Sequence, residues 1–516
     1  MHEKFRDAIK CQEPKTIDWE ADSDDEILES ALFNRSQQRG FFSSSMKNQD
    51  TKTNDGFYCD PDFTPNNAIG KEINGIEWQR PHKICEFWGY DPPKMYVDGG
   101  CQLDICQGNV GDCWFLAALA TVSMHKELLQ RVCPDQSFDK DNGYTGKFKF
   151  NFYQYGKWVE VTIDDRLPVY CGKLVYTSSN SKNEFWSALI EKAYAKLYGN
   201  YENLNGGHSS EAMVDLTGGS VEYIEKIDKM DEEELYQLVK TAISEQGSLL
   251  TAAIQSSQIE AKRADGLVVG HAYSVTKIAC FRMSDDEQGT CVHRLIRLRN
   301  PWGRCEWNGA FCDSDPRWGD AGADGDYDKT NDLNGEFWMP FKDFASIFTK
   351  TEICRLSVDD FEAEGKWYTD ESLKTHSRWG NDIKTAGGCP TNDSFLDNSF
   401  MPIKILGGKD SDEILVTLQQ KHRRKHKQHG VPYFKIGFTV YKVDVIKNNL
   451  CDMIEKTTEP VVPSVCAGRR DLSKKLKLPG DGDYIIVPST KYPDQIGKYY
   501  LQCYVERPNY EHIDFE

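Results

Sequence analysis

The stretch from Gln107 to Ala120 holds residue types suited to nucleophilic chemistry. Cys113 follows a glycine-rich turn and opens a run of Trp, Phe, Leu and Ala that predicts a largely buried helix. A cysteine at a helix N-terminus lies near unpaired N–H groups and the positive end of the helix dipole, which favour a thiolate over a thiol. Gln107 lies six residues upstream, and its side-chain amide can donate to the oxygen of a reacting carbonyl. We interpret Cys113 as a nucleophile and Gln107 as an oxyanion donor.

A cysteine nucleophile needs a base and a group that orients the base, because an isolated cysteine is more often a small buried hydrophobe. His271 lies in an apolar run, 266–275, with strand character, and Asn300 follows a second strand-like run at 295–299. Alone, the histidine is typical of a protein core and Asn-Pro of a turn. Two adjacent strands that end side by side would bring both residues to one edge. Trp302, just beyond, could then cover the bond between them.

Together these motifs resemble the calpain family, calcium-dependent cysteine proteases with a papain-like core. The resemblance rests on Gln107-Gly108, Gly111-Asp112-Cys113-Trp114, Gly270-His271-Ala272-Tyr273 and Asn300-Pro301-Trp302-Gly303. It extends from about residue 58 to the C-terminus. It implies that Cys113 is the nucleophile, His271 the general base and acid, Asn300 the orienting residue and Gln107 the oxyanion donor.

The expected fold class is α+β, with a two-subdomain papain-like protease core followed by an antiparallel, C2-like β-sandwich. We expect a polar tail over residues 1–57, a helical subdomain with the cysteine over 58–210, and a strand-rich subdomain with the histidine and asparagine over 211–356. Short alternating strands over 357–516 indicate the sandwich. Helices are predicted from residue 113 onward and over 185–198.

With nucleophile and base in different subdomains, activity depends on how the two close. The resemblance implies two calcium sites, one in each subdomain, built from the oxygen ligands that this ion prefers. The implied ligands of the first are the carbonyls of Val97 and Gly99 with the carboxylates of Asp104 and Glu184. Those of the second are Glu306, Asp313, Asp332, Asn334 and Glu336. Family members usually have aspartate at the position of Asn334, so we expect weaker binding at the second site.

Composition narrows the class of protein. The 516-residue chain carries a formal charge of −19, which argues against nucleic acid as the main partner. Seventeen cysteines at irregular spacing, without a CxxC pair, indicate mostly free thiols in a reducing compartment. No signal region or membrane-length apolar run appears, so we expect a cytoplasmic protein, recruited to membranes when calcium is present. No EF-hand loop appears, so we expect a monomer without an EF-hand small subunit.

One basic run stands out in this acidic chain, Lys421 to His429. Such a cluster can attract anionic phospholipid, an acidic protein, or an acidic loop of another domain of the same chain. A solvated hairpin tip explains it equally well.

The resulting hypothesis is a calcium-activated cysteine endopeptidase that makes limited cuts in protein substrates. Two alternatives stay open. A catalytically silent adaptor could bind lipid or protein through the sandwich. A transglutaminase-like acyl transferase also uses a Cys-Trp dipeptide with a histidine, but its third group is normally aspartate, and Asn300 with Pro301 and Trp302 favours the protease.

Overall fold

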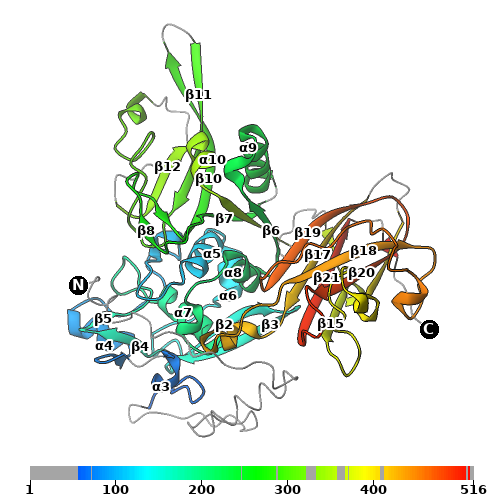
Figure 1. The fold of residues 1–516 in the computed structure, drawn as a ribbon. Helices are drawn as coiled ribbons and strands as arrows, with labels where there is room; N and C mark the ends of the chain where they lie inside the picture. The colour runs from blue at the N-terminus through cyan, green and yellow to red at the C-terminus, as the bar shows by residue number, and fades with distance from the viewer. Residues whose placement is uncertain are drawn as a thin grey trace.

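The computed structural model describes residues 56–70, 73–245, 247–285, 289–320, 333–356, 367–369, 371–406, 412–506 and 510–511. The expected tail, up to residue 55, and Asp332 lie outside these residues. The described chain has three parts: a helix-rich part, an upright sheet and a sandwich (Figure 1). Helices and antiparallel sheets occur together, which confirms the predicted α+β class. No helix in the described chain combines the length and apolar character needed to cross a bilayer.

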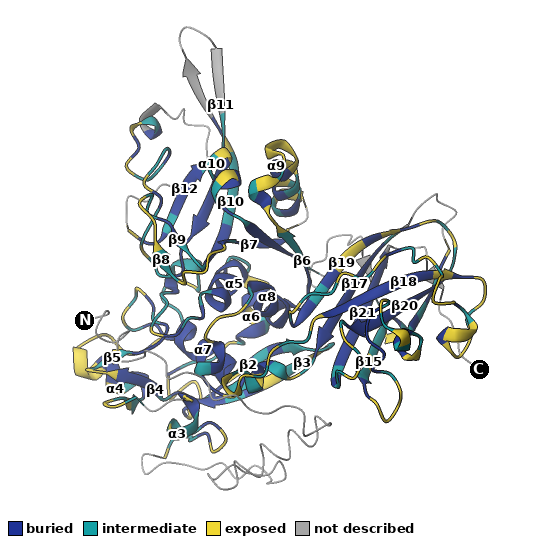
Figure 2. Ribbon diagram, in the orientation of Figure 1, coloured by how far each residue is buried: buried dark blue, intermediate teal, exposed yellow. Residues whose placement is uncertain are grey.

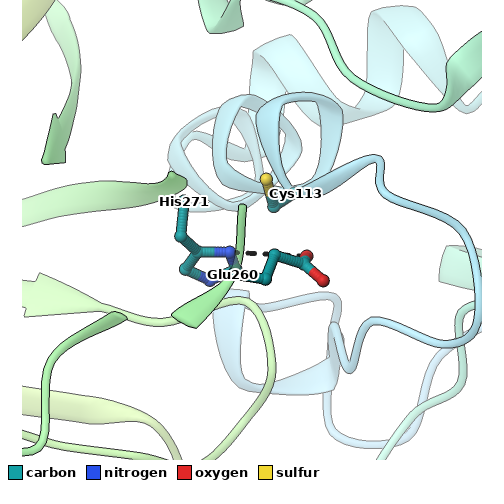
Figure 3. A group of neighbouring side chains, drawn as sticks. All are labelled: Cys113, Glu260 and His271. Carbon is teal, nitrogen blue, oxygen red and sulfur yellow. Dashed lines mark ion pairs between the residues drawn. The ribbon is translucent and has the colours of Figure 1, made fainter. Parts of the chain in front are cut away.

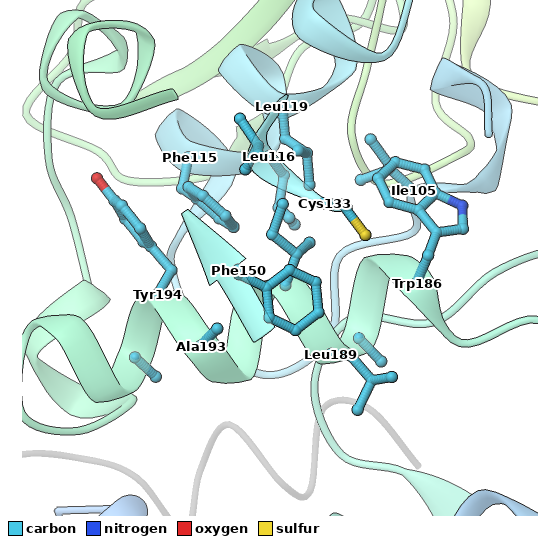
Figure 4. Close-up of a cluster of buried hydrophobic side chains, with 14 of the residues drawn as sticks. Ile105, Phe115, Leu116, Leu119, Cys133, Phe150, Trp186, Leu189, Ala193 and Tyr194 are labelled. Carbon is cyan, nitrogen blue, oxygen red and sulfur yellow. The ribbon is translucent and has the colours of Figure 1, made fainter. Parts of the chain in front are cut away.

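Helix α5, Cys113–Ser123, is the centre of the helix-rich part. Every residue from Trp114 to Ser123 is buried, as its apolar sequence predicts (Figure 2). Tyr194 of α7, Trp186–Leu197, stacks on Phe115 with ring centroids 4.1 Å apart (Figure 4). Both helices occur where the sequence predicts them. The other elements of this part are α3 (Pro65–Ala68), α4 (Pro81–Trp88), α6 (Lys126–Val132), α8 (Ser209–Thr217), β1 (Glu77–Gln79), β2 (Lys147–Gln154), β3 (Lys157–Asp164), β4 (Leu167–Tyr170) and β5 (Lys173–Leu174).

The upright part is a six-stranded antiparallel sheet in the order β12-β11-β10-β7-β13-β6. Its strands are β6 (Ser220–Glu225), β7 (Leu249–Ile254), β10 (His271–Asp285), β11 (Gly289–Arg299), β12 (Glu336–Pro340) and β13 (Lys350–Arg355), with helices α9 (Glu232–Lys240) and α10 (Phe341–Ile347). Strand β10 lies against α5, where Ser274 Oγ donates to the Ala117 carbonyl at 2.9 Å. The sheet is therefore tied directly to the helix that carries Cys113.

Two sheets packed face to face form the third part, the sandwich predicted from the short alternating strands (Figure 1). One contains β14 (Trp367–Tyr368), β15 (Lys374–Trp379), β17 (Asp412–Gln420), β19 (Asp471–Leu478) and β21 (Gly497–Glu506). The other contains β16 (Met401–Ile405), β18 (Ile436–Val443), β20 (Gly482–Thr490) and β22 (Tyr510–Glu511).

The basic run Lys421–His429 is not a solvated hairpin tip. It forms a short 3-10 helix, Arg423–His429, that packs on the helix-rich part. Arg424 is buried there, with its guanidinium 2.6 Å from the Glu211 carboxylate, and Lys427 Nζ donates to the Asn205 carbonyl at 2.5 Å. Burial, together with the charge of Arg424, lowers the pKa of Lys427 to about 8. The acidic group that this cluster meets belongs to the same chain.

Candidate active site

Cys113 is the first residue of α5 and lies at the floor of a cleft of about 1150 Å³. Its neighbour Trp114 is buried and donates from Nε1 to the Leu204 carbonyl at 2.8 Å, which fixes the first turn of the helix. Glycines lie where the turn before the helix passes close to other backbone. A side chain on Gly108 would meet the Tyr176 carbonyl oxygen at 2.4 Å. The turn, as well as the helix, thus determines where the sulfur lies.

His271 and Asn300 meet at one edge of the sheet. His271 begins β10 and Asn300 follows β11, and because these strands are paired, the two side chains come together. His271 Nε2 lies 2.8 Å from Asn300 Oδ1. The amide of Asn300 is oriented by two further bonds: its Nδ2 donates to the Cys305 carbonyl, and its Oδ1 accepts from Trp302 N. Its oxygen therefore faces the ring, and Nε2 carries the proton.

Trp302 covers this pair as the sequence suggested, with its ring centroid 5.0 Å from that of His271. His271 is only 3% exposed. Its other nitrogen, Nδ1, faces Cys113 and makes no hydrogen bond of normal geometry within the described chain. The imidazole is thus held through Nε2, and its Nδ1 lies where it can hold the proton of the Cys113 thiol.

A third side chain, Glu260, shares this space, and sequence reasoning missed it. Atoms of Cys113, Glu260 and His271 that can bind a metal all lie within 4.8 Å of one another (Figure 3). Glu260 Oε1 is 3.7 Å from His271 Nδ1. Glu260 comes from a loop that passes over Gly270, where a side chain would meet the Gln258 carbonyl oxygen at 2.4 Å. Glu260 lies eleven positions before the histidine, and no sequence motif marks it.

Gln107 lies beside these groups, but its amide is engaged. Nε2 donates to the Val110 carbonyl at 2.8 Å and to Glu260 Oε1 at 3.1 Å. Its backbone N–H donates to the Pro301 carbonyl at 2.8 Å, which links the cysteine turn to the asparagine loop. A carboxylate oxygen therefore occupies the position on this amide that a developing oxyanion would need.

The charges around Cys113 shift the titration of several groups. Burial by itself lowers the pKa of His271, but the Cys113 thiolate and the Glu260 carboxylate outweigh burial and raise it to about 10. Asp112, directly before the cysteine, is fully buried. Burial raises the pKa of Asp112 well above its ordinary value, and the neighbouring Glu191 adds to this effect. Burial also raises the pKa of Glu191, to about 7. The buried pair of Asp112 and Glu191 is not evident from the sequence.

The two carboxylates of the first implied calcium site lie close together in the structure, beside the turn that holds Val97 and Gly99. Glu184 Oε1 accepts from Val97 N at 2.6 Å, and Asp104 Oδ2 accepts from Cys101 N at 2.8 Å. Burial, aided by the charge of nearby Asp104, raises the pKa of Glu184 to about 7. Gly99, in the same turn as Val97, has a φ of +92°. Two buried carboxylates that repel each other beside a tight backbone turn fit a hard cation.

The second set comes together only in part. Glu306 Oε1 accepts from Gly335 N at 2.7 Å, and Asp313 hydrogen-bonds to Glu306, so these acids lie beside the turn that holds Asn334. Glu336 instead lies 3.5 Å from the Arg297 guanidinium. Asn334 Oδ1 already accepts from Glu336 N at 2.8 Å. The fit to calcium is fuller for the first set.

A cysteine at a helix N-terminus, with a histidine and an asparagine supplied by a neighbouring sheet, has the arrangement of a papain-like cysteine peptidase. Comparison with known proteins narrows this class. The model of the calpain family cysteine protease matches residues 58–355, and the model of calpain large subunit domain III matches 364–504. The chain belongs to the calpain family.

Individual relatives agree with the family models. The chain is 39% identical to calpain-A of Drosophila melanogaster, over 84% of this chain and 53% of the relative. It is 39% identical to mouse (Mus musculus) calpain-8, over 86% and 63%, and to human (Homo sapiens) calpain-9, over 83% and 61%. The chain therefore spans between about half and two thirds of the length of these relatives.

Proposed function

We propose that this chain is a calcium-activated cysteine endopeptidase that makes limited cuts in proteins. The observation that carries the proposal is the oriented imidazole. Asn300 fixes the proton on Nε2, so that Nδ1 of His271 faces the sulfur at the start of α5. A base in this tautomer can take the thiol proton and later pass it to a leaving amine.

In the proposed reaction, Cys113 attacks the scissile carbonyl, and the Gln107 amide and the Cys113 backbone N–H stabilise the oxyanion. His271 protonates the leaving amine, and water then releases the acyl group. The substrate must first displace the Glu260 carboxylate, because it accepts from Gln107 at 3.1 Å. Favourable contacts between the rest of the substrate and the cleft would offset the free energy needed to displace this carboxylate.

Calcium would be held by Asp104, Glu184 and the Val97–Gly99 turn, and more weakly by the group around Glu306. When bound, it would neutralise the buried acids and stiffen the segments that carry them. The 97–104 segment precedes Gln107, and Glu184 lies directly before α7, which packs on α5. Binding at this position therefore acts on the turn and the helix that set the position of Cys113.

Casein hydrolysis across a calcium titration tests this proposal, with a Cys113→Ala variant and an EDTA control. We expect cleavage that needs both calcium and Cys113. A folded protein that cleaves nothing at any calcium concentration would contradict the proposal and favour the silent adaptor. Incorporation of an amine into a glutamine-containing protein would favour the acyl transferase instead.

A further inference from the structure

The three side chains at the catalytic centre are a donor set for a transition metal. Cys113 offers sulfur, His271 an imidazole nitrogen and Glu260 a carboxylate oxygen, with all three ligand atoms within 4.8 Å of one another. Zinc accepts this combination, with bonds of about 2.0–2.3 Å, whereas calcium prefers oxygen alone. A tetrahedral zinc with such bonds places its nitrogen and oxygen ligands about 3.4 Å apart. The observed separation of His271 Nδ1 and Glu260 Oε1 is 3.7 Å.

The nitrogen of His271 that faces away from the other two ligands also makes the hydrogen bond expected of a metal-bound histidine. A metal-bound imidazole usually donates its other N–H to a carbonyl or carboxylate oxygen, which fixes the tautomer. His271 does so through Nε2 to Asn300 Oδ1 at 2.8 Å. Its Nδ1 is buried, has no hydrogen bond of normal geometry within the described chain, and is aimed at the sulfur and the carboxylate. This buried nitrogen is the second observation that points to a ligand, and a metal that binds there releases the proton that Nδ1 shares with Cys113.

Glu260 is held in place by contacts other than the histidine. Its backbone has a φ of +53°, and its carboxylate accepts from the Gln107 amide at 3.1 Å. With Cys113 as a thiolate, the three ligands carry two negative charges, which balance a divalent ion. Cys113 and Glu260 both line the open cleft, so an ion can arrive from solvent and keep water as its fourth ligand.

We propose that Cys113, His271 and Glu260 bind a zinc ion that blocks the catalytic centre. The ion would occupy the nucleophile and the base at once, so a substrate carbonyl could reach neither. Inhibition by zinc rests on the proposed protease function. Zinc binding by the three residues does not depend on that function. Glu260 is the ligand that distinguishes this site from a cysteine and histidine pair alone.

Protection of Cys113 from alkylation tests the site residue by residue. The full chain is treated with iodoacetamide over a zinc titration, and the modified cysteines are identified by peptide mass spectrometry. Cys171 and Cys451 are exposed and serve as internal comparisons. Two variants are compared with the parent: Glu260→Gln, and Glu202→Gln, which removes a carboxylate from the same cleft without touching the three ligands.

We expect zinc to protect Cys113 but not Cys171 or Cys451. Losing a ligand should raise the zinc concentration for half-protection at least about tenfold in Glu260→Gln, and Glu202→Gln should match the parent. Equal protection of all three cysteines, or parent-like protection in Glu260→Gln, would overturn the proposal.

Equilibrium dialysis with zinc gives a second measurement that needs no reactive thiol. The parent should retain about one more zinc per chain than Cys113→Ser, and equal retention would overturn the site. Casein cleavage in zinc-free, calcium-containing buffer is assayed separately. Failure of that assay alone would count against the protease function, and failure of protection and dialysis alone would count against the zinc site.

Discussion

Arg424 of the sandwich lies over the ring of Trp114, with the guanidinium carbon 4.3 Å from the ring centroid. Trp114 follows Cys113 in the chain, so a residue more than 300 positions later contacts the first turn of the nucleophile helix. Arg424 is also paired with Glu211 of α8, which accepts from Tyr433 at 2.9 Å. The sandwich thus contributes to the position of the candidate nucleophile.

Replacing Arg424 with alanine should destabilise the protein and reduce kcat more than it raises KM. Breaking a buried ion pair leaves the Glu211 carboxylate without its Arg424 partner, which costs about 3–5 kcal/mol of the free energy of unfolding. The loss of kcat is measured under conditions in which the variant is folded. It then reflects displacement of Trp114, and with it Cys113, rather than unfolding. Arg424→Lys should recover part of this loss.

Arg423→Ala is the matched control, because Arg423 lies over Phe434 within the sandwich, 3.3 Å from the ring centroid. Chemical denaturation and casein kinetics are compared for the three variants. Equal losses in Arg423→Ala and Arg424→Ala would contradict a specific role for the contact with Trp114.

Gln107→Ala tests the oxyanion donor. Removal of one such donor typically lowers kcat by about 10²–10³, because the bond matters most in the transition state. The variant should keep the calcium requirement of the parent and its rate of Cys113 alkylation, since the thiol is unchanged. Gln79→Ala, at a half-buried glutamine whose amide bonds to Glu77, is the control. A Gln107→Ala enzyme with parent kcat would show that the amide only anchors Glu260.

Glu184→Gln should raise the calcium concentration for half-maximal activity at least about tenfold, because affinity depends on the number of charged ligands. Glu86→Gln alters an exposed acid paired with Lys83 and should leave the requirement unchanged. Calorimetry with calcium should also resolve a weaker second class of site, from the Glu306 group. An unchanged requirement in Glu184→Gln would count against the first site.

Acid should destabilise the helix-rich part through Asp164. Burial by itself raises the pKa of this carboxyl, but Lys192 and Arg166 outweigh it and lower the pKa to about 2. Because the folded pKa lies below the unfolded value near 3.9, the stabilisation is full above about pH 4 and disappears as pH falls toward 2. It amounts to about 2.5 kcal/mol.

Denaturant unfolding between pH 5 and pH 2 measures this dependence. Asp164→Asn should flatten the acid limb of the curve, since it removes the titrating group. Asp141→Asn, at an exposed turn, should leave the limb as it is. A parent-like limb in Asp164→Asn would show that other carboxyls determine acid stability.

The local sequence pattern was enough to predict the helix and the strands that carry the site residues. The apolar run after Cys113 predicts α5, and strand character around His271 and before Asn300 places both residues at one sheet edge, where their side chains meet at 2.8 Å. These inferences succeed because helices and paired strands follow from periodicity over a few residues. The sandwich is predicted for the same reason.

Contacts between distant segments could not be predicted. Glu260 reaches the site because its loop crosses Gly270, and no periodic pattern encodes that crossing. The basic run around Arg424 has the composition of an exposed loop. Only the ion pair with Glu211 shows that Arg424 is buried and joins the sandwich to the helix-rich part. A charge run states what a segment can pair with, but not where its partner lies.

Covalent labelling by a peptidyl chloromethyl ketone, with calcium or with EGTA, shows whether calcium activates Cys113 as a nucleophile. The reagent alkylates a thiolate that its peptide positions in the cleft, and mass spectrometry identifies the modified residue. We expect one adduct, on Cys113, formed much faster with calcium and absent from Cys113→Ala. Adducts on other cysteines, or a Cys113 rate independent of calcium, would contradict this expectation.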